Sequence, residues 1–178
     1  PFPYTTLFRS GNVIAGSGAE DITGSDDDNV IDGNLGNDTI AGGDGNDDIE
    51  GDFGNDSLLG EGGNDTITGD DGTDVLEGGA GDDSLEGGED NDVLRGGDDN
   101  VPLRGGPDDN HTYGVVGNDF VPGLGGPDKP GGGEGNATLE GGGPNDRPSG
   151  DDGPESLVVA GGGEDWAVRN RHSRNPSH

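Results

Sequence analysis

Aspartate recurs every nine residues between residues 33 and 95, and carboxylates at so even a spacing are potential ligands of a metal ion. Seven consecutive nine-residue copies each have Asp at their sixth position, at Asp38, Asp47, Asp56, Asp65, Asp74, Asp83 and Asp92. Oxygen ligands without cysteine or histidine suit Ca²⁺ better than Zn²⁺ or copper. The chemistry that these residues predict is the binding of a hard divalent cation, and Ca²⁺ is the expected ion.

Three other positions of the copy are nearly constant. Gly opens every copy, position four is Gly except at Asp90, and position eight is always Ile or Leu. Glycine tolerates a positive φ and therefore allows a tight turn at positions one to six. The remaining triplet, for example 39–41, fits a short strand whose apolar residue points one way and whose neighbours point the other. Each copy therefore predicts one turn and one short strand.

Two such copies, 18 residues, would complete one coil of a solenoid, because each copy supplies half a turn. Alternate copies then stack on opposite edges with strands about 4.8 Å apart. This arrangement predicts two carboxylate columns, Asp38/Asp56/Asp74/Asp92 and Asp47/Asp65/Asp83. The expected fold is all-β, a right-handed parallel β-roll (β-solenoid) with 18 residues per coil and an irregular C-terminal extension.

Stacked carboxylates need a counter-charge. Two of them about 5 Å apart repel by roughly 1 kcal/mol even in bulk water, and by more near a protein surface. No Lys or Arg occurs between Ser10 and Leu94, so the chain does not neutralise them itself. A divalent cation would remove the repulsion and crosslink the coils. We therefore expect Ca²⁺ binding to be coupled to folding.

The nonapeptide pattern G-G-x-G-x-D-x-U-x resembles the RTX (repeats-in-toxin) or hemolysin-type calcium-binding repeat. The resemblance is strong over 33–95 and weaker over 15–32 and 96–167. It implies that Ca²⁺ lies between turns of adjacent coils, bound by the position-six Asp side chains and by backbone carbonyls of the turn. Those carbonyls would belong to Gly36, Gly45, Gly51, Gly54, Gly60, Gly63, Gly69, Gly72, Gly78 and Gly81.

Carried onto this chain, the resemblance implies about five calcium sites. The complete pairs are Asp38/Asp56, Asp56/Asp74, Asp74/Asp92, Asp47/Asp65 and Asp65/Asp83. Proteins of this family are secreted, typically by type I secretion, and attach such rolls to catalytic, toxin or adhesin domains. No such domain is visible in this sequence, so we expect a fragment of a larger exported protein. No signal peptide is recognisable either.

Composition excludes several classes of function. The 178 residues include 42 Gly, only 24% are hydrophobic, and the formal net charge is −31. Low hydrophobicity with high net charge is typical of a disordered chain unless something neutralises the charge. Such acidity disfavours nucleic acid and an anionic membrane surface as partners, and no clear membrane segment is present. Two alternatives to a calcium-binding roll remain open: an acidic disordered spacer, and a calcium-dependent adhesion module.

The regions around the repeats are less regular. Residues 1–14 do not repeat, although Phe2, Tyr4 and Phe8 could cap the first coil. Residues 15–32 contain two weaker copies with Glu20 and Asn29 at position six, which could be poorer ligands. We expect a calcium-binding roll over 15–95. Residues 96–167 are expected to be degenerate repeats that form an irregular roll or are partly disordered. Residues 168–178 form a basic tail, and Trp166 is a second candidate cap. In 96–167 only Asp128/Asp146 is a complete Asp pair, among prolines such as Pro130 and Pro148.

No catalytic constellation is recognisable, and we expect the chain not to be an enzyme. The three His lie outside any known motif. General acid–base catalysis needs a unique pair of groups in different environments, whereas columns of equivalent Asp provide many similar ones. We therefore name no catalytic residue.

Overall fold

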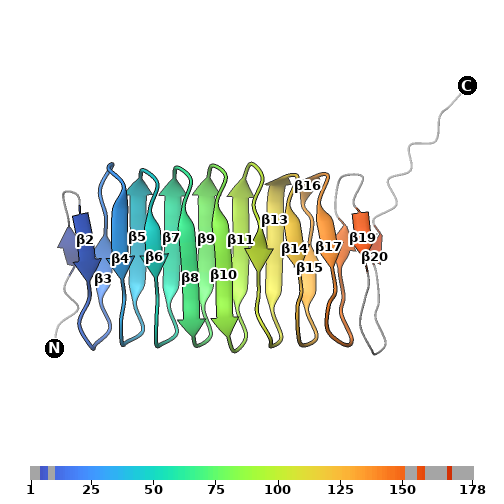
Figure 1. The fold of residues 1–178 in the computed structure, drawn as a ribbon, viewed down its shortest axis with the longest axis horizontal. Helices are drawn as coiled ribbons and strands as arrows, with labels where there is room; N and C mark the ends of the chain where they lie inside the picture. The colour runs from blue at the N-terminus through green and yellow to red at the C-terminus, as the bar shows by residue number, and fades with distance from the viewer. Residues whose placement is uncertain (1–4, 8–10, 151–155, 159–167, 170–178) are drawn as a thin grey trace, which may run out of the picture.

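The structure, a computed structural model, describes residues 5–7, 11–150, 156–158 and 168–169. All regular elements in these residues are β-strands, and every pair of neighbouring strands is parallel. Figure 1 shows the strands side by side along one elongated body, linked by narrow turns at both edges. The candidate caps Phe2, Tyr4, Phe8 and Trp166 lie outside the described residues, as does the basic tail apart from β20 (Val168–Arg169).

Three parallel sheets form the faces of this body. The 11-stranded sheet contains β1 (Thr5–Leu7), β3 (Asp21–Thr23), β5 (Thr39–Asp44), β7 (Ser57–Gly62), β9 (Val75–Ala80), β11 (Val93–Asp98), β13 (His111–Gly117), β15 (Lys129–Gly131), β18 (Ser149–Gly150) and β20, with β16 (Glu134–Gly135) also paired to β13. The six-stranded sheet contains β2 (Gly11–Ile14), β4 (Asn29–Asp32), β6 (Asp48–Glu50), β8 (Thr66–Asp71), β10 (Ser84–Glu89) and β12 (Leu103–Arg104). The third sheet contains β14 (Phe120–Pro122), β17 (Thr138–Glu140) and β19 (Ser156–Val158).

The register of the strands confirms the 18-residue coil. Thr39 pairs with Ser57 in one sheet, and Asp48 pairs with Thr66 in the other, each partner 18 residues further on. From β1 to β15, strands of odd and even number therefore alternate between the two faces, as half-coils of nine residues require. The predicted fold class, an all-β parallel solenoid with an irregular C-terminal extension, is confirmed.

The core of the solenoid consists of the position-eight side chains. Ile, Leu and Val at this position are between 0 and 5% exposed from Val13 to Leu139 and form one continuous cluster. Position seven and position nine of most strands point outward, which is the alternation that an extended strand imposes. Most coils thus bury one apolar side chain from each face, and the stack of coils makes the cluster continuous.

Many strands are longer than the predicted triplet. β5 runs from Thr39 to Asp44, so it includes the two glycines that open the next copy. Gly43 has a φ of +112°, which glycine adopts readily, and it pairs with Glu61 of the next coil. Because the glycine backbone continues the parallel pairing, the turn that remains is shorter than expected.

The irregular part begins where proline enters the pairing positions. The six-stranded sheet ends at β12, and the third sheet continues the same face through one isolated bridge between Pro102 and Phe120. Proline has no N–H to donate to a neighbouring strand, so regular pairing at Pro102 is interrupted. Strand pairing nevertheless continues beyond it, for example between Val121 of β14 and Leu139 of β17.

One residue of the apolar column is polar. Thr112 replaces Ile or Leu between Leu94 and Pro130, is 1% exposed, and its Oγ1 has no hydrogen-bond partner. A buried hydroxyl without a partner costs about 1–3 kcal/mol. We expect Thr112→Val to stabilise the fold by roughly 1 kcal/mol, measured as the urea midpoint of the calcium-loaded chain.

Thr66→Val is the control for this prediction, because Thr66 occupies an exposed strand position. Its urea midpoint should match that of the parent chain. An unchanged or lower urea midpoint for Thr112→Val would show that the buried hydroxyl does not destabilise the fold.

Candidate metal centre

The seven position-six aspartates lie inside the roll, directly beneath its turns. Their exposed fractions are between 0 and 3%. Each follows a turn and precedes the first residue of a strand, so its side chain points inward like the apolar residue two positions later. Val101 and Ala137 occupy the same position in later copies and belong to the hydrophobic cluster, which shows how deep this position is.

One carboxylate oxygen of each aspartate joins two neighbouring coils. The backbone N–H of Asp38 donates to Oδ1 of Asp56 at 2.7 Å, and the N–H of Asp56 donates to Oδ1 of Asp74 at 2.8 Å. On the opposite edge the N–H of Asp47 donates to Oδ1 of Asp65 at 2.8 Å. The same bond joins Asp65 to Asp83 and Asp74 to Asp92. The structure thus brings together all five pairs that the sequence indicated.

The other carboxylate oxygen has no such partner. Oδ2 is buried and lacks a hydrogen bond in Asp38, Asp47, Asp56, Asp65, Asp74, Asp83 and Asp92. A buried carboxylate oxygen without a donor is costly unless it is protonated or bound to a cation. The pattern repeats in both columns, so it is a property of the repeat rather than of one residue.

Backbone carbonyls converge on the free oxygens. Both Oδ2 of Asp56 and the carbonyl oxygen of Gly69 lie within 2.8 Å of the point where a Cβ of Gly51 would be. The carbonyls of Gly51, Gly60 and Gly78 lie in the same way beside Oδ2 of Asp38, Asp47 and Asp65, with all these atoms within 3.1 Å of the corresponding Cβ point. A carboxylate oxygen and carbonyl oxygens beside a space that only glycine leaves open form a donor set suited to Ca²⁺.

The position-four glycines bring their carbonyls to the next coil. A Cβ on Gly54 would overlap the carbonyl oxygen of Gly36 and would lie 3.2 Å from Oδ1 of Asp56. Gly63, Gly72 and Gly81 approach the carbonyls of Gly45, Gly54 and Gly63 in the same way. The structure therefore places these carbonyls between adjacent turns, where the sequence expected ligands.

The electrostatic environment of the columns favours neutralisation. Burial raises the pKa of Asp56 to about 6, against the opposing effect of the N–H of Asp38, and the charges of Asp74 and Asp38 raise it further. Burial likewise raises the pKa of Asp92 to about 7. At Asp56 and Asp92 protons therefore compete with a cation near pH 6 to 7.

We expect acid to replace part of the calcium requirement. Because the folded-state pKa values are raised, the folded chain keeps protons between about pH 4 and 7 that the unfolded chain releases. The resulting stabilisation is present below pH 4 and is lost as the pH rises through 6 to 7. Circular dichroism with a chelator should show more β-structure at about pH 5 than at pH 7.5. Equal spectra at both pH values would contradict this expectation.

The structure also contains position-six carboxylates beyond residue 95. Asp119 and Asp128 are 1% exposed, and each has an Oδ2 without a hydrogen bond. Their Oδ1 atoms accept the N–H groups of Val101 at 3.0 Å and Asn110 at 2.9 Å. The N–H of Asp128 donates to Oδ1 of Asp146 at 3.0 Å, so this pair is in register despite the nearby prolines.

Position five forms a second column that sequence reasoning missed. Here the hydrogen bond runs in the opposite direction, since the N–H of Asn55 donates to Oδ1 of Asn37, 18 residues earlier, at 3.1 Å. Asn64 and Asn46 repeat it at 2.9 Å on the other edge. The recurrent Asn-Asp dipeptide was the available signal. These exposed amides connect the turns but do not surround the buried Oδ2 atoms.

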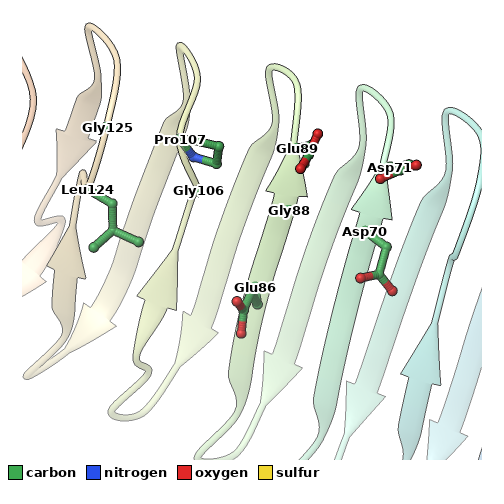
Figure 2. A pocket seen from close by; sticks show the side chains of 9 residues that line it. All are labelled: Asp70, Asp71, Glu86, Gly88, Glu89, Gly106, Pro107, Leu124 and Gly125. Carbon is green, nitrogen blue, oxygen red and sulfur yellow. The ribbon is translucent and has the colours of Figure 1, made fainter.

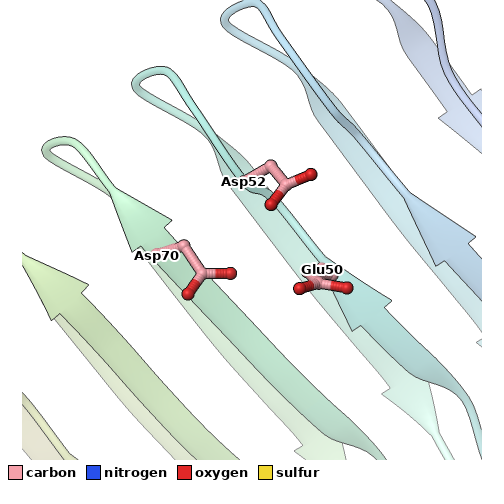
Figure 3. Close-up of side chains that lie close together, drawn as sticks. All are labelled: Glu50, Asp52 and Asp70. Carbon is pink, nitrogen blue, oxygen red and sulfur yellow. The ribbon is translucent and has the colours of Figure 1, made fainter.

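A surface cluster of acids lies apart from the columns. One carboxylate oxygen each from Glu50, Asp52 and Asp70 lies within 4.8 Å of the others, and Figure 3 shows the three side chains on adjacent coils. Burial and neighbouring acidic charges raise the pKa of all three. These groups are in contact with solvent, whereas the position-six carboxylates are buried.

The same face continues into an open groove of about 520 Å³. Figure 2 shows Asp70, Glu86 and Glu89 along it, with Pro107 and Leu124 at its other end. The residues that line the groove include the four acids Asp70, Asp71, Glu86 and Glu89 and no His, Ser or Thr. Among the described residues there is also no apolar helix long enough to span a membrane.

In a comparison with known protein families, one family model matches the chain. The family model of the RTX calcium-binding nonapeptide repeat (4 copies) matches residues 14–49, 41–76, 50–85, 68–101 and 86–121. These overlapping matches together span 14–121, more than half of the 178 residues. No curated protein matches the chain.

Proposed function

The chain belongs to the family of RTX calcium-binding nonapeptide repeats, and on this premise we propose that the position-six columns bind Ca²⁺ and that binding drives folding. The observation that supports the proposal is the free Oδ2 of each position-six Asp. It is buried, has no hydrogen-bond donor, and faces carbonyl oxygens beside a glycine. Calcium would supply the positive charge that these oxygens lack and would crosslink adjacent coils.

We assign the ligands by column. The side chains are Asp38, Asp56, Asp74 and Asp92 on one edge and Asp47, Asp65 and Asp83 on the other. The carbonyls are those of the position-one and position-four glycines described above. Counting complete pairs gives about five ions. Hard oxygen ligands of this kind bind Ca²⁺ in preference to Mg²⁺, because Mg²⁺ is smaller and dehydrates reluctantly.

The energetic consequence depends on the calcium concentration. A site at ten times its Kd stabilises the folded chain by about 1.4 kcal/mol, so five sites together contribute roughly 7 kcal/mol. With dissociation constants of about 10⁻⁴ M, typical of extracellular calcium modules, millimolar Ca²⁺ would fold the chain and sub-micromolar Ca²⁺ would not. This difference supports the further proposal that the module belongs to a protein that is exported unfolded and folds outside the cell.

The experiment that tests the proposed function is isothermal titration of the full chain with Ca²⁺. We expect about five ions at neutral pH and little heat with Mg²⁺. The spacer alternative predicts diffuse binding that disappears in 0.5 M salt, because exposed charges are screened there. Salt-resistant, stoichiometric binding would support the columns, and loss of all binding in salt would overturn them.

A further inference from the structure

Asn110 occupies the place of an aspartate in one of the carboxylate columns. It is fully buried, and its Oδ1 accepts the N–H of Asp92 at 2.8 Å, as the Oδ1 of an Asp would. Its own N–H donates to Oδ1 of Asp128 at 2.9 Å. The backbone and the first side-chain oxygen are therefore in register with the column.

The second side-chain atom differs. Nδ2 of Asn110 donates to the carbonyl oxygen of Asp108, at position four of the same copy, at 3.0 Å. In an Asp copy the equivalent atom is Oδ2, which cannot donate to that carbonyl. Oδ2 has no hydrogen bond in the Asp copies and needs a cation or a proton, whereas the amide supplies its own N–H.

Asn29 repeats this arrangement at the other end of the roll. It is 1% exposed, and its Nδ2 donates to the carbonyl of Asp27, again at position four, and to Oγ of Ser25 at 3.3 Å. The sequence had suggested Asn29 as a poorer calcium ligand. Its amide is instead engaged with the turn, which leaves less capacity for an ion.

The coil that contains Asn110 also lacks a carboxylate on its opposite edge. Position six there is Val101, whose N–H donates to Oδ1 of Asp119 at 3.0 Å. Residues 96–113 thus form one coil without a buried charge at position six. Buried carboxylates lie on both sides of it, at Asp83 and Asp92 before it and at Asp119 and Asp128 after it.

We propose that coil 96–113 closes without a metal ion, because the amide of Asn110 makes the contact that Ca²⁺ makes in the Asp copies. The inference rests on the proposed function. It separates the five paired sites before residue 96 from the buried carboxylates Asp119, Asp128 and Asp146 after residue 113 by a coil that does not depend on calcium. In each copy, the residue at position six then determines whether the turn needs an ion: Asp requires one, and Asn does not.

The proposal predicts opposite effects for two substitutions. Asp74→Asn should let its turn close without an ion, so the chain should need less calcium to fold while binding fewer ions. Asn110→Asp should create a calcium-dependent turn between Asp92 and Asp128, so the chain should bind at least one more ion and need more calcium. Asp71→Asn and Asn91→Asp are matched controls, because they make the same charge changes at exposed positions.

A metal-free titration separates this inference from the proposed function. In a chelator, trimethylamine N-oxide drives folding by favouring burial, and circular dichroism gives the osmolyte midpoint of each variant. We expect a lower midpoint for Asp74→Asn and a higher one for Asn110→Asp, each relative to its control. If either variant matches its control, the inference is overturned, whatever the parent chain does with calcium. If the parent binds no Ca²⁺ while these shifts are present, the proposed function alone fails.

Discussion

Gly63→Ala is expected to disrupt the roll strongly, because the added methyl group has no room in its turn. Gly63 has a φ of +128°, and a Cβ there would overlap the carbonyl oxygen of Gly45 in the preceding coil. The positive φ strains an alanine, and the neighbouring main chain cannot move away without breaking its pairing. We therefore expect the free energy of unfolding to fall by roughly 3 kcal/mol or more. The calcium midpoint of the folding transition, followed by circular dichroism, should rise accordingly.

The adjacent glycine supplies the control. A Cβ on Gly62 would meet only the end of the Asp44 side chain, at 3.2 Å, which can move away. Gly62→Ala should therefore fold at nearly the calcium concentration of the parent chain. Similar behaviour of the two variants would show that the close approach of turn to turn is not required.

Asp65→Ala is expected to remove two of the five paired sites and to weaken folding. The substitution deletes the acceptor of the Asp47 N–H and also the free Oδ2. A buried N–H without an acceptor costs about 1–3 kcal/mol. With three sites left to compensate, the calcium midpoint should rise at least about threefold, and titration should count about two fewer ions.

Asp44→Ala removes the same charge from an exposed position and is the matched control for this substitution. Asp44→Ala should change the calcium midpoint only slightly, because it weakens the general attraction of the acidic chain for Ca²⁺ and removes no ligand. Equal midpoints for Asp65→Ala and Asp44→Ala would place the ions on the surface rather than in the columns.

The repeat made the coil length and both columns predictable. A side chain every nine residues can face inward in every copy only if two copies close one coil, so Asp56 had to lie above Asp38. The regular glycines predicted the turns, because glycine tolerates the positive φ that a tight turn needs. The match extends to the apolar column, where Ile40 stacks on Leu58.

The sequence did not reveal how the carboxylates are held. Residue types showed that Asp38 and Asp56 would be neighbours. They suggested that both carboxylates lack hydrogen bonds and that both oxygens of each are equally available to an ion. The structure shows that one oxygen of each is already bonded to a backbone N–H, so only the second oxygen is available for an ion. Hydrogen bonds from the main chain depend on the exact strand register, which a residue pattern does not specify.

The degenerate half shows the other limit of sequence reasoning. Prolines such as Pro130 argued against regular pairing, yet Pro130 is buried in β15 opposite Thr112. Proline lacks an N–H but keeps its carbonyl and fits an extended backbone, so it can be part of one strand position without ending the stack. Asn110 likewise stands where earlier copies have Asp, and its amide donates to the carbonyl of Asp108 in its own turn.

The most direct test of the central claim is far-UV circular dichroism of the full chain during a Ca²⁺ titration, with Mg²⁺ in parallel. We predict a cooperative change from coil to β-structure between sub-millimolar and millimolar Ca²⁺ and none with Mg²⁺. A chain that stays coil at tenfold higher Ca²⁺, or one that is fully β-structured in a chelator at neutral pH, would contradict the coupling of calcium binding to folding.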